Sequence, residues 1–173
     1  MFHLFFLRIK SIKYIIYVLS LTVLVACSDS FKPEVSVGVK TPASNNKKIE
    51  KDSDWREVCS MDTPDHLHKW TLSELREKNM PYLVVFGTPQ HCTMCVDQLI
   101  RVASLQEKYG DRFAFLHVDG YRDDAVWVEW GIKGEPWTYI VDGNGVVQNL
   151  FPGPTDPFLM ENAIDKILEL SDR

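Results

Sequence analysis

The sequence predicts a single α/β domain in which one mixed β-sheet carries helices on both faces. Apolar runs typical of strands alternate with segments of helical spacing from about residue 71 to residue 170. Two of the strand segments are joined only by Asp142-Gly143-Asn144-Gly145, which favours a β-hairpin. A strand–helix–strand unit followed by a hairpin and a closing helix gives a sheet with parallel and antiparallel neighbours. The length of 173 residues leaves room for one such domain.

The first 26 residues have the features of a secretory signal. Three basic residues precede an uncharged apolar run at 14–26, which is shorter than the roughly 20 residues of a membrane-spanning helix. An uncleaved N-terminal anchor is the alternative interpretation. Either interpretation places the domain on the far side of a membrane and tethers it to that membrane.

The apolar run ends in Leu24-Val25-Ala26-Cys27, which resembles the lipobox of bacterial lipoproteins. This resemblance implies that Cys27 is lipidated and that the protein is anchored in the bacterial cell envelope, facing the periplasm. Ser28 follows the cysteine, and by the sorting rule of Gram-negative lipoproteins it favours the outer membrane over the inner one. Residues 27–54 are polar and without apolar periodicity, so we expect a flexible tether ahead of a domain at 55–173.

The charge of the mature chain argues against one class of partner. Without the three basic residues of the signal, 16 of the 19 Lys and Arg remain against 24 Asp and Glu, a formal charge of −8. Such an acidic protein is a poor binder of nucleic acid.

Each element of the domain has its own signal. Thr71-Leu72-Ser73-Glu74 has the form of a capping box and opens a short helix that ends near Asn79. The remaining elements are expected, in order, as a strand at 82–86, a helix at 92–109 stopped by Gly110, a strand at 113–118, a helix from Asp123 or Asp124 through Trp130, strands at 137–141 and 146–151, and a helix at 157–170.

Cys92 and Cys95 fall where a strand and its loop give way to a helix. The helix dipole and the free backbone N–H groups at that point favour a thiolate at Cys92. Cys95 lies one turn further along, where it can attack a mixed disulfide formed at Cys92. The chain has four cysteines and no second CxxC to complete a four-ligand zinc site, so we predict a redox pair and no metal.

Three segments around the pair resemble the thioredoxin family in order and spacing: Val84-Val85-Phe86-Gly87, Leu116-His117-Val118-Asp119, and Gly131-Ile132-Lys133-Gly134-Glu135-Pro136. The run that begins at Pro136-Trp137 is more similar to the membrane-anchored TlpA-like group. The resemblance extends from about Trp70 to the C-terminus. It implies a thioredoxin-like fold, a redox-active disulfide between Cys92 and Cys95, and a cis peptide bond before Pro136 that faces this disulfide.

The chain lacks a buried acidic residue that thioredoxins have near the active site. Thioredoxins carry a carboxylate ahead of the active site where Val85 or Phe86 stands here, and a lysine where Phe115 stands. Proton transfer to and from Cys95 must therefore use other groups or water.

Other residues near the pair are candidates for tuning it. As an imidazolium, His91 would favour the Cys92 thiolate, whereas Glu135 would disfavour it if its carboxylate faces the site. Either side chain can instead face solvent. Trp137 follows the proline and is a candidate border of the substrate groove, with core packing as the alternative.

Cys59 is expected to be a buried or accessory thiol. A metal site formed by Cys59, His66 and His68 together with the CxxC has neither the spacing nor the ligand count of a standard site.

These observations predict an extracytoplasmic thiol–disulfide oxidoreductase, without organic cofactor, that acts on protein thiols and disulfides. We expect a monomer, held at the membrane by its lipid, that exchanges electrons with an upstream redox donor or acceptor. The TlpA-like resemblance favours reduction, although Thr93-Met94 matches the dipeptide of neither typical reductases nor strong oxidants. The alternative function is copper(I) binding, since Cys92, Met94 and Cys95 offer soft ligands.

Overall fold

The computed structural model describes residues 34–171. The predicted signal, the lipobox and Cys27 lie outside the described residues. Within the described range, no helix is both long and apolar enough to cross a membrane.

The described helices and strands follow the predicted order. They are η1 (Trp55–Glu57), α2 (Leu72–Glu77), β1 (Tyr82–Gly87), α3 (Thr93–Tyr109), η2 (Gly110–Arg112), β2 (Ala114–Asp119), α4 (Asp124–Trp130), β3 (Trp137–Val141), β4 (Val147–Pro152) and α5 (Pro157–Ser171). The predicted boundaries of the strands and of α3, α4 and α5 are confirmed to within one residue. Helix α2 ends two residues before Asn79, whose backbone has a positive φ of 51°.

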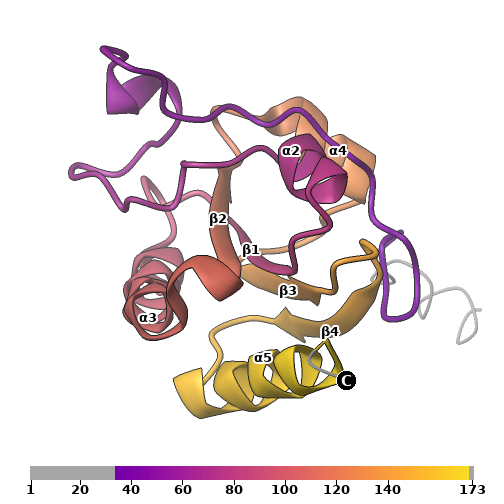
Figure 1. The fold of residues 1–173 in the computed structure, drawn as a ribbon. Coiled ribbons are helices and arrows are strands. Elements are labelled where there is room, and N and C mark those ends of the chain that lie inside the picture. Colours follow the sequence, from indigo (N-terminus) through magenta and orange to yellow (C-terminus); the bar gives the residue numbers. More distant parts are fainter. Residues whose placement is uncertain (1–33, 172–173) are drawn as a thin grey trace, which may run out of the picture. The chain divides into compact units, whose positions relative to one another are not determined.

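The strands form one mixed sheet in the order β2-β1-β3-β4 (Figure 1). β1 pairs in parallel with β2 and antiparallel with β3, and β3 pairs antiparallel with β4. The predicted hairpin turn joins β3 and β4, where Asp142 Oδ1 accepts hydrogen bonds from the N–H groups of Asn144 and Val146. Gly145 in this turn has a φ of 78°, which is easily adopted only by glycine.

Helices cover both faces of the sheet, as the α/β prediction requires. Because side chains alternate along a strand, Leu83 and Val85 of β1 pack with α3 and α5, while Val84 and Phe86 pack with α2 and α4. Figure 1 shows α3 and α5 on one side of the sheet and α2 and α4 on the other. The two cores leave all of β1 buried.

Helix α2 begins at the predicted capping box. Thr71 Oγ1 accepts a hydrogen bond from the Glu74 N–H at 3.1 Å, and Glu74 Oε2 accepts one from the Thr71 N–H at 2.9 Å. Two N–H groups that the first turn leaves unbonded are thereby satisfied.

The prediction of a flexible tether does not hold for residues 34–53, which pack against the domain. Lys40 forms a β-bridge with Val146, and Thr41 Oγ1 lies 2.9 Å from the Tyr82 hydroxyl in a buried hydrogen bond. Asn46 Oδ1 accepts a hydrogen bond of 2.8 Å from the Leu72 N–H. Side-chain hydrogen bonds to distant residues hold this segment in place, and such bonds leave no apolar periodicity in the sequence.

Candidate redox site

The Cys92–Cys95 pair lies at the N-terminus of α3, as predicted. Cys92 is the N-cap residue and Cys95 stands in the first turn, and their sulfurs form a disulfide with the Cα atoms 5.2 Å apart. The Cys95 N–H donates a hydrogen bond of 3.1 Å to Cys92 Sγ. Cys92 is 9% exposed and Cys95 is fully buried, so Cys92 alone of the two offers surface to a partner.

Pro136 completes the site at the start of β3. The Glu135–Pro136 peptide bond is cis, as the resemblance implies. β3 lies next to β1 in the sheet, and β1 ends shortly before the cysteines. The structure therefore combines a four-stranded mixed sheet with a disulfide at a helix N-terminus and a cis proline beside that disulfide. The fold is thioredoxin-like.

Glu135 faces the disulfide of this thioredoxin-like site rather than open solvent. One of its carboxylate oxygens and the two sulfurs all lie within 4.8 Å of one another. The side chain of Glu135 is 19% exposed. Its Oε2 atom is buried and has no hydrogen-bond partner in the described part of the chain. A negative charge at this distance from Cys92 acts directly on the stability of its thiolate.

His91 is bound to that carboxylate. Its Nε2 lies 2.6 Å from Glu135 Oε1, and its ring centroid lies 5.2 Å from that of Tyr121. The His91 side chain is half exposed. The two tuning candidates therefore form one pair at the rim of the site, in which a protonated His91 would offset the charge of Glu135.

Trp137 lies in the core and not along a groove. It is 6% exposed, is in register with Phe86 of β1, and packs in the cluster that includes Val84 and Tyr139. This burial favours the core-packing alternative for Trp137. Met94, a ligand in the copper prediction, is 51% exposed beside the disulfide.

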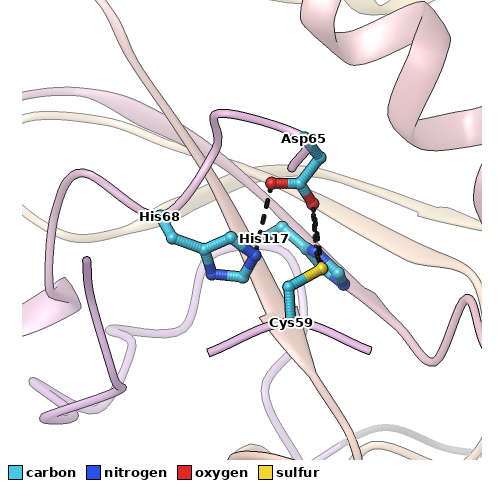
Figure 2. Close-up of side chains that lie close together, drawn as sticks. All are labelled: Cys59, Asp65, His68 and His117. Carbon is cyan, nitrogen blue, oxygen red and sulfur yellow. Dashed lines mark hydrogen bonds and ion pairs between the residues drawn. The ribbon is translucent and has the colours of Figure 1, made fainter. Parts of the chain in front are cut away.

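A second cluster of polar side chains lies buried behind the redox pair: Cys59, Asp65, His68 and His117 (Figure 2). Sequence reasoning named Cys59 and His68 but associated them with His66, which is exposed. It missed Asp65 and a role for His117. The signal for His117 was present, because it is the one polar residue within an otherwise apolar run at 113–118.

Opposite charges hold this cluster together. Burial by itself would lower the pKa of His117, but its hydrogen bonds with Asp65 and Cys59 outweigh burial and raise the pKa to about 10. Burial likewise would raise the pKa of Asp65, and its hydrogen bonds with His117 and His68 instead lower it. The pKa of the Cys59 thiol is lowered because hydrogen bonding to His117 and His68 outweighs its burial.

The cluster is connected to the redox pair through Gly87, the last residue of β1. The Gly87 carbonyl lies 3.0 Å from His117 Nε2. A Cβ atom at Gly87 would lie 3.2 Å from Cys95 Sγ, a contact tighter than side chains normally make. Glycine at this position lets the backbone pass between the buried cluster and Cys95.

Comparisons with known proteins find partial similarities. No protein-family profile matches the chain. Over 65 residues, 38% of the chain, the sequence is 29% identical to the thiol:disulfide interchange protein DsbE of Allochromatium vinosum. The matched stretch covers only 35% of that protein.

Similar solved structures include thioredoxins. Mitochondrial thioredoxin 3 of Saccharomyces cerevisiae is 18% identical with a TM-score of 0.46, over 55% of this chain and 89% of that one. The thioredoxin of Fasciola hepatica is 20% identical with a TM-score of 0.48, over 54% and 89% of the two chains.

Proposed function

We propose that this protein is an extracytoplasmic thiol–disulfide oxidoreductase that exchanges disulfides with cysteines of other proteins and acts mainly as a reductase. The observation that carries the proposal is the Cys92–Cys95 disulfide at the N-terminus of α3, with the cis Glu135–Pro136 bond beside it. The partial similarity to a thiol:disulfide interchange protein supports the same chemistry.

The proposed cycle begins with both cysteines reduced. The Cys92 thiolate attacks one sulfur of a substrate disulfide, forms a mixed disulfide and releases the other substrate sulfur as a thiolate. The thiolate of Cys95 then attacks Cys92 Sγ, which releases the second substrate thiol and forms the Cys92–Cys95 disulfide. Two electrons pass to the substrate, and an upstream thiol donor returns them by the reverse exchange.

The exposures of the two cysteines support these roles. Cys92 has surface that a substrate disulfide can reach, whereas the fully buried Cys95 can reach only a sulfur already attached to Cys92. Pro136 has no N–H group, so the backbone at the cis bond leaves its edge free for an extended substrate.

Trapping of partner proteins tests the proposal on the full chain expressed in a bacterial envelope. Cys95→Ser should accumulate mixed disulfides through Cys92, because the resolving thiol is absent, and Cys92→Ser should accumulate none. Purified wild type should catalyse insulin reduction by dithiothreitol, and the double serine variant should not. Adducts on Cys92→Ser, or equal insulin reduction by the double variant, would contradict the proposal.

The location is part of the proposal and rests on the lipobox-like Leu24-Val25-Ala26-Cys27. Radiolabelled palmitate should be incorporated into wild type and not into Cys27→Ala. Fractionation of the labelled protein then distinguishes the outer membrane, which Ser28 favours, from the inner one. Labelling that persists in Cys27→Ala would refute this assignment.

A further inference from the structure

The buried cluster of Cys59, Asp65, His68 and His117 has the composition and geometry of a metal centre (Figure 2). Each residue is at most 8% exposed, and one ligand atom from each lies within 4.8 Å of the others. We propose that these four side chains bind one divalent zinc ion. The proposal does not depend on the redox activity of the Cys92–Cys95 pair.

The chain brings the four ligands together from two segments. His117 stands on β2, and its backbone N–H donates a hydrogen bond of 3.0 Å to the Leu67 carbonyl, which places the loop alongside the strand. The Ser60 N–H donates a hydrogen bond of 2.7 Å to Asp119 Oδ2 and thereby fixes Cys59 over the end of β2. These two hydrogen bonds therefore hold the loop between Cys59 and His68 against β2.

The candidate ligand atoms, all within 4.8 Å of one another, lie close to the spacing of a tetrahedral ion. Cys59 Sγ lies 3.7 Å from Asp65 Oδ2 and 3.8 Å from His117 Nδ1, and His68 Nε2 lies 3.3 Å from Asp65 Oδ1. Zinc bonds of about 2.0 to 2.3 Å at tetrahedral angles separate neighbouring ligand atoms by about 3.3 to 3.6 Å. The hydrogen-bonded pair of His117 Nδ1 and Asp65 Oδ2 is closer than this, and an ion between them would take the place of the proton they share.

The tautomer of His117 suits metal binding. Its Nε2 lies 3.0 Å from the Gly87 carbonyl, which only accepts hydrogen bonds, so Nε2 carries the proton. In the neutral ring Nδ1 then keeps its lone pair and faces the thiol and carboxylate. A backbone carbonyl that holds the far nitrogen of a ligand histidine is the usual support of such a ligand.

His68 supplies an independent indication of a ligand. Its side chain is 2% exposed and its Nε2 lies 3.3 Å from Asp65 Oδ1 in an ion-pair contact, while its Nδ1 has no hydrogen-bond partner among the described residues. Buried polar atoms almost always have a partner, because an unsatisfied one destabilises the fold. A metal ion at the centre of the cluster would bind Nε2, the ring nitrogen that lies beside Asp65.

Charge and donor type select zinc among common cations. A thiolate at Cys59 and a carboxylate at Asp65 give two negative charges, which a divalent ion neutralises inside the buried cluster. Sulfur and imidazole donors disfavour magnesium and calcium, which take oxygen ligands. A closed four-ligand site without an open position corresponds to a structural rather than a catalytic zinc ion.

The test uses the full chain in detergent with the Cys92–Cys95 disulfide kept oxidised, so that this pair cannot bind metal. Mass spectrometry of the purified protein should find one zinc ion per chain. Because the ligands are buried, the metal is removed by unfolding with a chelator, and the chain is refolded with Co²⁺. We expect the ligand-field bands of tetrahedral cobalt and one thiolate-to-cobalt charge-transfer band.

Matched variants assign the ligands. Cys59→Ser should lose the charge-transfer band, and both Cys59→Ser and His68→Ala should bind Co²⁺ at least about tenfold more weakly. His66→Ala changes an exposed histidine two positions from His68 and should bind like wild type. Cys27→Ser and the Cys92→Ser/Cys95→Ser double variant should also bind like wild type.

Several results would overturn the proposal. These are wild type without bound zinc or cobalt, a charge-transfer band that survives Cys59→Ser, and binding lost in the Cys92→Ser/Cys95→Ser variant. If Cys59→Ser does not fold, X-ray absorption at the zinc edge of wild type decides the matter. One sulfur ligand with nitrogen and oxygen neighbours supports the site, and no sulfur or two sulfurs refutes it.

Discussion

Replacement of Glu135 by glutamine should make the Cys92–Cys95 disulfide a stronger oxidant. The carboxylate lies within 4.8 Å of both sulfurs, so it repels a Cys92 thiolate in the reduced state and has no such charge to repel in the disulfide. Coulomb's law at 4.8 Å gives about 0.9 kcal/mol with the dielectric constant of water and about 3.5 kcal/mol at an effective value of 20.

The pairing with His91 reduces this effect. The His91 side chain is half exposed and its Nε2 lies 2.6 Å from the carboxylate, so solvent and this hydrogen bond both screen the repulsion. We therefore expect Glu135 to destabilise the Cys92 thiolate by about 1 kcal/mol. Because about 1.4 kcal/mol corresponds to 30 mV for a two-electron couple, Glu135→Gln should raise the reduction potential by roughly 20 mV.

Equilibration with glutathione buffers measures this shift on the full chain. His91→Gln should lower the potential, since it removes the ring that hydrogen-bonds to the Glu135 carboxylate, and the double variant should lie between the two single variants. Glu169→Gln, on the exposed face of α5, is the matched control and should leave the potential unchanged. A Glu135→Gln potential equal to or below that of wild type would refute the electrostatic argument.

Three stability predictions follow from the packing, each measured by urea unfolding of the full chain. Thr71→Ala removes the α2 cap and should cost about 1 kcal/mol; an unchanged midpoint would show that the capping box adds no stability. Leu99→Ala opens a cavity beneath α3 and should cost about 2 to 5 kcal/mol, and a loss below 1 kcal/mol would contradict its assigned burial. Thr41→Val breaks the buried hydrogen bond to Tyr82 and should cost about 1 kcal/mol, whereas no loss would mean that residues 34–53 contribute little to stability.

Local signals explain why most elements could be predicted from the sequence. The capping box at Thr71, the glycine after α3 and the Asp142–Gly145 turn each satisfy backbone groups within a few residues. The apolar run that became β1 is buried on both faces, as expected of a strand inside a sheet with helices on both sides. Such signals require no knowledge of distant contacts.

Long-range polar contacts account for what the sequence did not reveal. Asn46 bonds to the backbone of Leu72, 26 positions away, and Asp65 bonds to His117, 52 positions away. Neither pairing has a period or a spacing rule that a single sequence can display. The packed segment at 34–53 and the buried cluster were therefore missed for one physical reason.

A buried polar group lies behind Cys95 on β2, one strand away from the position where the thioredoxin pattern has a carboxylate. Val85, one of the two positions that match the family's carboxylate, is in register with His117 on β2. Neighbours in register point to the same face of a sheet, so His117 supplies a polar group on the face that Val85 leaves apolar. Its partners come from the loop between Cys59 and His68 rather than from β1.

This arrangement makes the Gly87 carbonyl the contact between the proposed zinc site and the redox pair. Gly87 bonds to His117 on one side and lies against Cys95 on the other. Thermodynamic linkage then requires two free-energy changes to be equal: the change that zinc makes in the free energy of reducing the disulfide, and the change that reduction makes in the free energy of zinc binding. A potential shifted by about 30 mV on metal removal corresponds to a tenfold difference in affinity between the two redox states. Measurement of both quantities on the same preparation therefore checks whether the two sites are coupled or only adjacent.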